Sequence, residues 1–298
     1  MLPFSEILTS LALPPEATDL LLADAGGTST DWLYLRASEA APLRLRTAGM
    51  NPNAYDDAHL QAQVEAVAAG IGKELKCDVP PLAIAFYGAG CSGAGAERVR
   101  EAIARVLRHT IVYIGSDLEL AARTLFGVSA GTACILGTGA NSGFWDGWHF
   151  THHTPPLGFI LGDEGSGADL GRELLRRVLR GELPATLAAA LQSEGLAVSE
   201  AEAIQRIYRR PGAAAYLGSF VPFIASHADE AAIASFVEER FRMFLQRHVV
   251  PYGEAARRSP IGFVGGAVFA LRRIMQRAAA AEGLQVGRIL SAPLAAFV

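Results

Sequence analysis

Two stretches of the chain place glycine and hydroxyl residues between segments that have the composition of strands. The first, residues 20–35, passes from an apolar run to Asp24, then to a polar tip and a second apolar run. The tip consists of Gly26, Gly27, Thr28, Ser29 and Thr30. Such a hairpin can bring backbone N–H groups up to an anion, because glycine permits a tight turn and adds no side chain in the ligand's way. A carboxylate beside the tip would repel phosphate unless a cation lay between them, so Asp24 predicts a magnesium-nucleotide site, with an ordinary glycine turn as the alternative.

The second stretch repeats this design from Gly131 to about Trp145. An apolar run leads to a tip of Gly137, Thr138 and Gly139, and a strand-like segment follows. Two such hairpins about a hundred residues apart predict one supersecondary unit used twice. Two tips that faced each other could hold a polyphosphate from both sides.

Three further polar segments lie next to predicted strands or helices. Asp117 follows a strand expected over residues 110–114, at the point where an α/β sheet gathers ligands; a helix N-cap is the alternative, and the two roles are compatible. Asp163 and Glu164 stand between glycines ahead of a helix, and buried carboxylates are costly unless they bind something, such as sugar hydroxyls. Pro52 forces an extended loop that presents Asn51, which would bind a sugar or cap the next helix, with the cap favoured.

Gly265 and Gly266 follow a predicted strand, residues 261–264, and precede a helix that is expected to reach residue 281. This arrangement suits the adenosine part of a nucleotide, although close helix packing explains such glycines as often. His152 and His153 would point to opposite faces of a strand and therefore would not share a metal ion. His248 is expected at the edge of the core.

Composition limits the class of protein. A length of 298 residues predicts two domains, and 51% hydrophobic residues with 31 glycines indicate a well-packed globular protein with many turns. The net charge of −4 argues against a nucleic-acid surface. The three cysteines show no metal-ligand spacing, which predicts reduced thiols in a cytoplasmic protein. Residues 1–18 lack Lys and Arg, unlike a signal peptide, and no apolar run approaches the roughly 18 residues of a membrane span.

The remaining pattern predicts an α/β chain with a helical second half. Helices are expected over residues 3–13, 58–75, 183–194, 199–208 and 213–227, and strands over residues 43–47 and 81–87.

Taken together, these motifs resemble the N-acetylglucosamine kinase branch of the sugar kinase, Hsp70 and actin superfamily, the group also named for the benzoyl-CoA reductase ATPase subunits. The resemblance runs from about residue 20 to near the C-terminus. It rests on residues 24–30, Ser116-Asp117, Gly137-Thr138-Gly139 with Asn141, residues 162–166 and Gly265-Gly266. It implies two ribonuclease-H-like, actin-like ATPase α/β domains with an interdomain cleft. An extension would cover residues 1–18, the first domain 19–117 with 282–298, and the second 118–281.

The resemblance also implies the chemistry. The chain would be an ATP-dependent kinase that phosphorylates the 6-hydroxyl of N-acetylglucosamine or N-acetylmuramic acid in cell-wall salvage, with Asp117 as general base and Asp24 holding Mg²⁺ through water. The nucleotide would be bound by Asp24, Gly26, Gly27, Thr28, Gly137, Thr138, Gly139, Gly265 and Gly266. The sugar would be bound by Asn51, Asn141, Gly158, Asp163 and Glu164. Relatives are often dimers, which implies a homodimer.

The sequence departs from the family pattern in two places, and two alternative functions stay open. Many relatives carry a basic residue where Ser29 stands, so one phosphate contact is expected to be missing, and residues 291–298 form a short apolar end. An ATPase that activates a dehydratase or reductase would need thiolates for an iron-sulfur cluster, a motif that Cys91 and Cys134 do not form. A non-catalytic sugar sensor would lack the base that Asp117 supplies. Arg46 is a candidate partner for the lactyl carboxylate of N-acetylmuramic acid.

Overall fold

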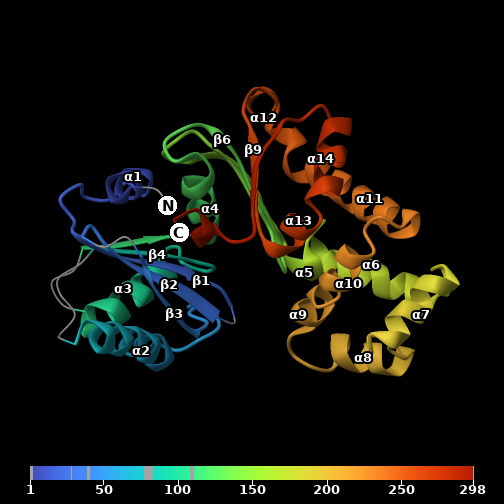
Figure 1. Ribbon diagram of the computed structural model, residues 1–298, viewed down its shortest axis with the longest axis horizontal. Helices are drawn as coiled ribbons and strands as arrows, with labels where there is room; N and C mark the ends of the chain where they lie inside the picture. Colours follow the sequence, from blue (N-terminus) through green and yellow to red (C-terminus); the bar gives the residue numbers. More distant parts are fainter. Residues whose placement is uncertain (1–2, 28, 39–40, 77–82, 108–110, 298) are drawn as a thin grey trace. The chain divides into compact units, whose positions relative to one another are not determined.

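The structure is a computed structural model that describes residues 3–27, 29–38, 41–76, 83–107 and 111–297. The chain divides into two compact units (Figure 1). The first unit is Met1–Val128 with Pro293–Val298, and the second is Ser129–Ala292. The expected α/β class with two domains is confirmed, although the division falls elsewhere than the sequence indicated.

The division differs at both junctions for reasons of packing. Helix α4 (Asp117–Phe126) belongs to the first unit, because Leu120 is buried in that unit's core. Strand β10 (Val286–Leu290) belongs to the second unit, because it pairs with β9 (Ile261–Val264). Residues expected to form an N-terminal extension also join the first unit, where Ile7 is buried in the core.

The first unit is built on a five-stranded sheet in the order β3-β2-β1-β4-β5. Strands β1 and β2 form the predicted hairpin, β3 extends it antiparallel, and β4 and β5 add parallel to β1. The strands are β1 (Asp19–Ala25), β2 (Ser29–Arg36), β3 (Leu43–Ala48), β4 (Ala83–Gly88) and β5 (Ile111–Gly115). Residues 81, 82 and 110, which the sequence assigned to strands, lie outside the described residues.

Helices cover both faces of this sheet, so β1 is apolar on both sides. Leu21 and Ala23 face a core shared with α2 (Asp57–Leu75) and α3 (Ala94–Val106). Leu20 and Leu22 face a core shared with α1, α4 and the short C-terminal helix η2. The bounds of the two helices not yet given are α1 (Phe4–Ser10) and η2 (Pro293–Phe297). A continuous apolar run is the expected signature of a strand buried on both faces.

The second unit repeats the arrangement with the order β10-β9-β6-β7-β8. Its hairpin is again central, β8 extends the hairpin antiparallel, and β9 and β10 add parallel. The hairpin strands and their neighbour are β6 (Gly131–Leu136), β7 (Ala140–Trp145) and β8 (Phe150–Thr154). The repeat predicted from the two glycine tips is therefore a repeat of the whole sheet.

The described residues of the second unit also form eleven helical segments. They are α5 (Gly158–Leu161), α6 (Gly167–Leu179), α7 (Ala185–Ser193), α8 (Glu200–Tyr208), α9 (Ala213–Gly218), α10 (Val221–Ser226), α11 (Ala231–His248), η1 (Val250–Tyr252), α12 (Glu254–Arg258), α13 (Gly266–Ala270) and α14 (Arg272–Ala281). The helix expected over residues 213–227 is interrupted between α9 and α10, where Pro222 lies in the first turn of α10. The helix that was expected to run from Gly266 to residue 281 is broken at Leu271 into α13 and α14.

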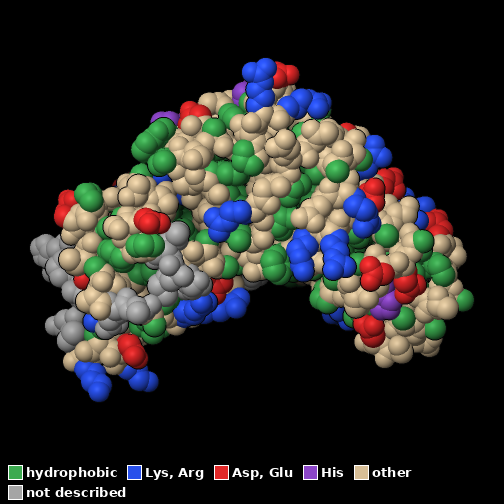
Figure 2. Space-filling model, turned by 45° about the horizontal axis from the view of Figure 1, so that its top comes forward, with side chains coloured by type: hydrophobic (Ala, Val, Ile, Leu, Met, Phe, Trp, Pro, Cys, Tyr) green, Lys and Arg blue, Asp and Glu red, His purple; other side chains and the backbone are tan. Residues whose placement is uncertain are grey.

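Surface charge is mixed on the face that Figure 2 shows, where acidic and basic side chains are interspersed. Among the described residues, no helix has both the length and the apolar character that crossing a membrane requires.

Candidate functional site

The first hairpin ends in a compact tip beside Asp24. The N–H of Gly26 donates to the carbonyl of Ser29 at 2.9 Å, which closes the turn. A methyl group placed on Gly27 would meet no atom within 4 Å, so space is open above this residue. Thr28, a predicted nucleotide-binding residue, lies outside the described residues. The tip thus has the bare, accessible backbone that an anion site requires.

Parallel pairing brings Asp117 to the same sheet edge as Asp24. Asp24 pairs with Tyr87 on β4, and Tyr87 pairs with Gly115, the last residue of β5. Asp117 begins α4 two residues later, and its Oδ1 accepts the N–H of Leu118 at 2.8 Å. The N-cap of α4 is not Asp117 but Ser116, whose Oγ accepts from the N–H of Glu119 at 3.1 Å. The capping alternative for Asp117 was therefore wrong by one residue.

The two carboxylates interact electrostatically. Burial, and then the charges of Asp117 and Asp31, raise the pKa of Asp24 from 3.8 to about 7. Asp31 is the register partner of Asp24 across the hairpin, so its charge lies on the same face of the sheet. Carboxylates crowded in this way favour protonation or a bound cation. The cluster consequently suits a magnesium-nucleotide complex.

The loop that carries Asn51 lies on the same unit. The Oδ1 of Asn51 accepts the N–H of Asn53 at 2.9 Å, which fixes the amide within its own turn. Gly90, at φ +77°, packs against this amide, and a methyl group there would lie 2.5 Å from Oδ1. The cap of α2 is Asp56, whose carboxylate accepts the N–H of His59 at 2.8 Å. Asn51 is therefore not needed as a cap.

The second tip is fixed by the start of α6. The N–H groups of Gly167 and Ala168 donate to the carbonyls of Gly137 and Thr138 at 2.7 and 3.1 Å. Within the tip, the N–H of Gly137 donates to the carbonyl of Gly139 at 3.0 Å. These bonds turn the carbonyls of Gly137 and Thr138 toward the helix, away from any anion at the tip.

Gly265 brings the predicted adenosine motif into contact with the second tip. It adopts φ +139°, and a methyl group at this position would lie 2.8 Å from the N of Gly137. Gly266, its neighbour, has open space around it. The two glycines thus have different roles: the first permits close backbone approach, and the second leaves room.

Asp163 supports the second tip from the side. Its Oδ1 accepts the N–H of Ala140 at 3.0 Å, and a methyl group on Gly139 would lie 3.1 Å from its Oδ2. The residue is buried and adopts φ +56°, an unfavourable backbone conformation for a non-glycine residue. Burial raises its pKa. Backbone strain of this kind is frequent at binding and active sites, so Asp163 stays a candidate site residue.

Glu164, unlike Asp163, contacts two basic side chains. Its Oε2 lies 3.0 Å from the Nε2 of His248, and its Oε1 forms an ion pair with Arg247. Although burial opposes the effect, the hydrogen bonds from His248 and Arg247 lower its pKa. Both oxygens are thus engaged by the protein. Sequence reasoning missed these two bases, since nothing in the pattern relates residue 164 to the end of α11.

The other predicted sugar residues lie at the start of β7 and the start of α5. Asn141 begins the second half of the hairpin, and its Oδ1 accepts the N–H of Ser142 at 2.9 Å and lies 3.1 Å from the Nε2 of His153. Gly158 adopts φ +73° at the first position of α5. His153 is exposed and contacts this amide.

A cavity of about 580 Å³ opens beside the second tip. Its lining is mainly glycine and small apolar residues: Gly137, Thr138, Gly167, Gly218, Val221, Pro222, Gly266, Ala267 and Ala270. Such a lining suits a flat apolar ring, with the tip at one side for phosphates. Gly218 and Pro222 flank the break between α9 and α10, where the sequence predicts one continuous helix. A glycine and a proline four residues apart were the signal for that break.

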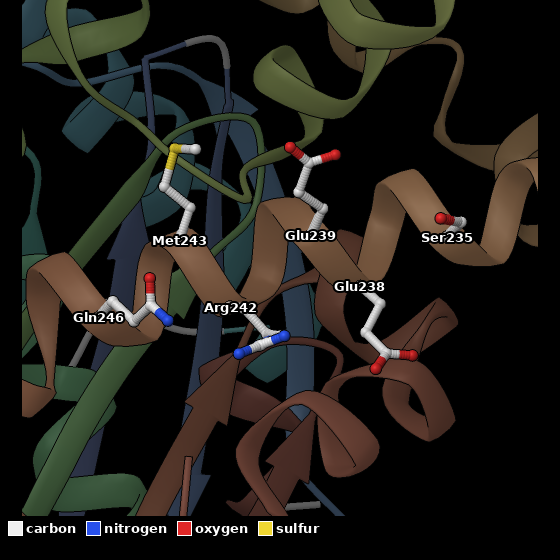
Figure 3. Close-up of a pocket in the computed structure, with 6 residues that line it drawn as sticks. All are labelled: Ser235, Glu238, Glu239, Arg242, Met243 and Gln246. Carbon is white, nitrogen blue, oxygen red and sulfur yellow. The ribbon is translucent and has the colours of Figure 1, made fainter. Parts of the chain in front are cut away.

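Another hollow, of about 730 Å³, runs along α11, and all six of its lining side chains come from that helix (Figure 3). Arg242 and Gln246 both donate to Glu282 at 2.9 Å, and Glu238 pairs with Arg277. None of the candidate residues lines it. The hollow is a groove on the surface of α11, and it shares no lining residue with the cavity beside the second tip.

Two matching sheets, each with a central hairpin and a glycine tip, define the actin-like ATPase fold that sugar kinases use. No family model and no curated protein matches the chain. Among solved structures, a protein from Porphyromonas gingivalis that is provisionally named N-acetylglucosamine kinase is 37% identical, with a TM-score of 0.83 over 93% of this chain and 96% of that one. A provisionally named N-acetylglucosamine kinase from Chromobacterium violaceum is 18% identical, with a TM-score of 0.67 over 94% and 97% of the two chains.

A ROK family glucokinase from Streptomyces griseus, solved with glucose and AMPPNP, shares the fold at 16% identity, with a TM-score of 0.50 over 93% of this chain and 95% of that one. The chain belongs to the N-acetylglucosamine kinase-like branch of the sugar kinase, Hsp70 and actin superfamily.

Proposed function

We propose that this protein is an ATP-dependent kinase that transfers the γ-phosphate to the 6-hydroxyl of an N-acetylated amino sugar. The observation that carries the proposal is the placement of Asp24 and Asp117 at one sheet edge, beside a glycine tip with open space. Phosphoryl transfer depends on positioning, charge neutralisation and a base for the nucleophile, and this edge offers residues for each.

Asp117 acts as the general base. As the sugar oxygen bonds to the γ-phosphorus, the bond from phosphorus to the bridging oxygen of the β-phosphate breaks, and the hydroxyl proton passes to Asp117. ADP and the sugar 6-phosphate are the products. The hydrogen bond from Leu118 holds one oxygen of this carboxylate in place, which orients the group before the substrate arrives.

Asp24 is the residue proposed to hold magnesium, through water. The raised pKa of Asp24 supports this role, because a cation would relieve the repulsion from Asp117 and Asp31. Magnesium usually takes only one or two carboxylates and completes its shell with water and phosphate oxygens, so a single aspartate fits. When bound, the ion neutralises charge on the phosphates.

Each glycine tip is a proposed phosphate-binding element. The residues concerned are Gly26 and Gly27 in the first tip, and Gly137, Thr138 and Gly139 in the second. The cavity wall of Gly266, Ala267 and the α9–α10 break receives the adenosine. The glucokinase neighbour was solved with AMPPNP, which supports ATP as the phosphate donor.

The sugar is assigned to Asn51, Asn141, Gly158 and Asp163, whereas both oxygens of Glu164 are already engaged by Arg247 and His248. Two arginines bear on the choice of sugar. Arg46 lies at the first tip, with its Nη2 2.8 Å from the Oγ of Ser29, and Arg98 beside the Asn51 loop is engaged by Asp57 and two backbone carbonyls. The contacts of Arg98 occupy its guanidinium within the loop, and exposed Arg46 is assigned to the phosphates rather than to a lactyl carboxylate, which favours N-acetylglucosamine over N-acetylmuramic acid.

The activator alternative requires reactive thiolates. Burial raises the pKa of Cys91 to about 12 and also raises that of Cys134, so both described cysteines stay protonated at neutral pH. Protonated buried thiols are poor cluster ligands. The kinase proposal therefore stands ahead of it.

The test is an ADP-release assay with Mg-ATP and, in turn, N-acetylglucosamine, N-acetylmuramic acid, glucosamine and glucose. We expect turnover with N-acetylglucosamine, and a fall in kcat of about 10²- to 10⁴-fold in Asp117→Asn, the usual contribution of a general base. Glu97→Gln, an exposed carboxylate on α3, is the matched control. Binding of sugar and ATP without sugar-dependent ADP release would overturn the proposal in favour of a sensor.

A further inference from the structure

Tyr55 connects two segments of the first unit to which the proposed function assigns different substrates. Its side-chain hydroxyl donates to the carbonyl of Gly27, at the first glycine tip, at 3.0 Å. Its backbone N–H donates to the carbonyl of Asn51 at 3.1 Å, within the loop of residues 49–56, here called the Asn51 loop. One residue thus touches both the proposed phosphate site and the proposed sugar site.

The two segments are also packed directly against each other. Gly49 begins the Asn51 loop and is buried beneath the tip. A methyl group on Gly49 would lie 2.5 Å from the carbonyl oxygen of Gly27 and 2.9 Å from that of Gly26. Because no atom fits between them, a displacement of the tip must displace the start of the loop.

Tyr55 is itself held rigidly. Its ring stacks on His59, with centroids 4.1 Å apart and planes 10° from parallel. The Nε2 of His59 lies 2.9 Å from the carbonyl oxygen of Gly49. Through His59, the Tyr55 ring is therefore linked to the start of the loop. A ring fixed on one face and a hydroxyl fixed at its end leave Tyr55 little freedom to relax on its own.

Arg98 fastens the far side of the loop to α3. Its Nη2 donates to the carbonyl of Tyr55 at 2.9 Å, its Nη1 donates to the carbonyl of Pro52, and its Nε pairs with Asp57 at 2.6 Å. The loop is therefore anchored to a helix on one side and to the glycine tip on the other. The Tyr55 hydroxyl is the hydrogen bond that joins the loop's side chains to the tip.

From this geometry we propose that Tyr55 is a positioning residue that couples sugar binding at the Asn51 loop to nucleotide binding at the first tip. The proposal rests on the proposed function for the identity of the two ligands. A shift of the tip on phosphate binding would pass through the Gly27 carbonyl to Tyr55 and to Asn51. Each ligand would then tighten the other, by the reciprocity that linkage requires.

The experiment compares the wild type with Tyr55→Phe, which removes the hydroxyl and keeps the stacked ring. Calorimetry gives the Kd of Mg-AMPPNP with and without saturating N-acetylglucosamine. We expect the sugar to tighten nucleotide binding about fivefold or more in the wild type, a typical size of allosteric coupling, and less than about twofold in Tyr55→Phe. The Kd of each ligand alone should change little, which a general loss of structure would not produce.

Tyr34→Phe is the matched control, because its hydroxyl makes a comparable hydrogen bond, to Asp19 at 2.6 Å, at the opposite end of β1. It should keep the wild-type coupling. Unchanged coupling in Tyr55→Phe, or no coupling in the wild type, would overturn the inference. The ADP-release assay on the wild type is read separately: absence of turnover overturns the kinase function, whereas coupling between the bound sugar and nucleotide tests Tyr55 alone.

Discussion

Asp24 and Asp117 lie at neighbouring strand ends of the first sheet, and the charge of Asp117 adds to burial in raising the pKa of Asp24 to about 7. The fold itself creates this pair, because parallel strands bring their carboxyl ends to one edge. Without a ligand the arrangement costs stability at neutral pH. With a cation and a nucleophile present, the same arrangement supplies a metal-binding group and a base.

The first prediction is that Asp24→Asn stabilises the ligand-free protein at pH 8. The folded-state pKa is raised above the unfolded value of 3.8, so the wild type loses stability as pH rises from about 4 to about 7. The variant has no charge to bury and should exceed the wild type by about 4 kcal/mol at pH 8, of which about 2–3 kcal/mol develops above pH 5. Urea denaturation in EDTA at pH 5 and pH 8 measures the difference. If the stability difference between the variant and the wild type did not grow with pH, folding would not raise the pKa of Asp24.

The second prediction separates the two glycines of the adenosine motif. Gly265→Ala places a methyl group against the backbone at Leu136 and Gly137 and requires φ +139°, so it should lower the free energy of unfolding by about 2–4 kcal/mol. Gly266→Ala has open space and should fold normally, but its methyl group enters the cavity and should raise KM for ATP. Thermal melts and ATP titrations of both variants check this. Equal melting temperatures would contradict the predicted close contact at Gly265.

The sequence predicted the positions of the hairpins and of the double glycine better than the contacts that support them. The two hairpins, Asp117 and the double glycine were visible because glycine tips and strand ends have local signatures. What supports them is not local. The contact of Glu164 with His248 joins residues that are 84 positions apart in the sequence. The hydroxyl of Ser142 donates to the carbonyl of His248, which is 106 positions away. Such partners depend on how helices return to a sheet, which no pattern within one segment encodes.

The break between α9 and α10 is a second example. Apolar spacing predicted one helix over residues 213–227, because the amphipathic pattern continues through the break. Gly218 and Pro222 interrupt the helix there, and the break forms a wall of the cavity. Hydrophobic periodicity records which residues face the core, but it does not record where the backbone hydrogen bonds stop.

A third prediction concerns Glu164, which the sequence placed on the sugar. The structure engages both its oxygens, so Glu164→Gln should lower stability more than it changes KM for the sugar. Breaking the pair with buried His248 should cost about 2–3 kcal/mol at pH 7. Because the folded-state pKa of Glu164 is lowered, its contribution is present above pH 4.5 and is lost as pH falls further.

Denaturation of Glu164→Gln at pH 7 and at pH 4, with sugar KM measured in parallel, tests this assignment. Arg247→Ala is the comparison, since that arginine is 59% exposed and its ion pair should contribute little. A large rise in sugar KM with unchanged stability would return Glu164 to the sugar site.

The last prediction addresses the phosphate contact that Ser29 lacks. The Nη2 of Arg46 on β3 lies 2.8 Å from the Oγ of Ser29, and its Nε is 3.6 Å from Asp31. Since the side chain is 69% exposed, the guanidinium is free to turn to an incoming phosphate. Arg46→Ala should raise KM for ATP about fivefold to tenfold and leave KM for the sugar unchanged, more so at low salt.

Rescue makes this prediction specific. Lysine at position 29 would supply a charge at the same tip, so Ser29→Lys in the Arg46→Ala background should recover most of the ATP affinity. Arg44→Ala is the matched control, because Arg44 lies two residues earlier on the same face of β3, opposite Leu33. If Arg46 served a lactyl carboxylate instead, its loss would affect turnover of N-acetylmuramic acid alone. The lysine would then fail to rescue, since a charge at the phosphate tip would be in the wrong place.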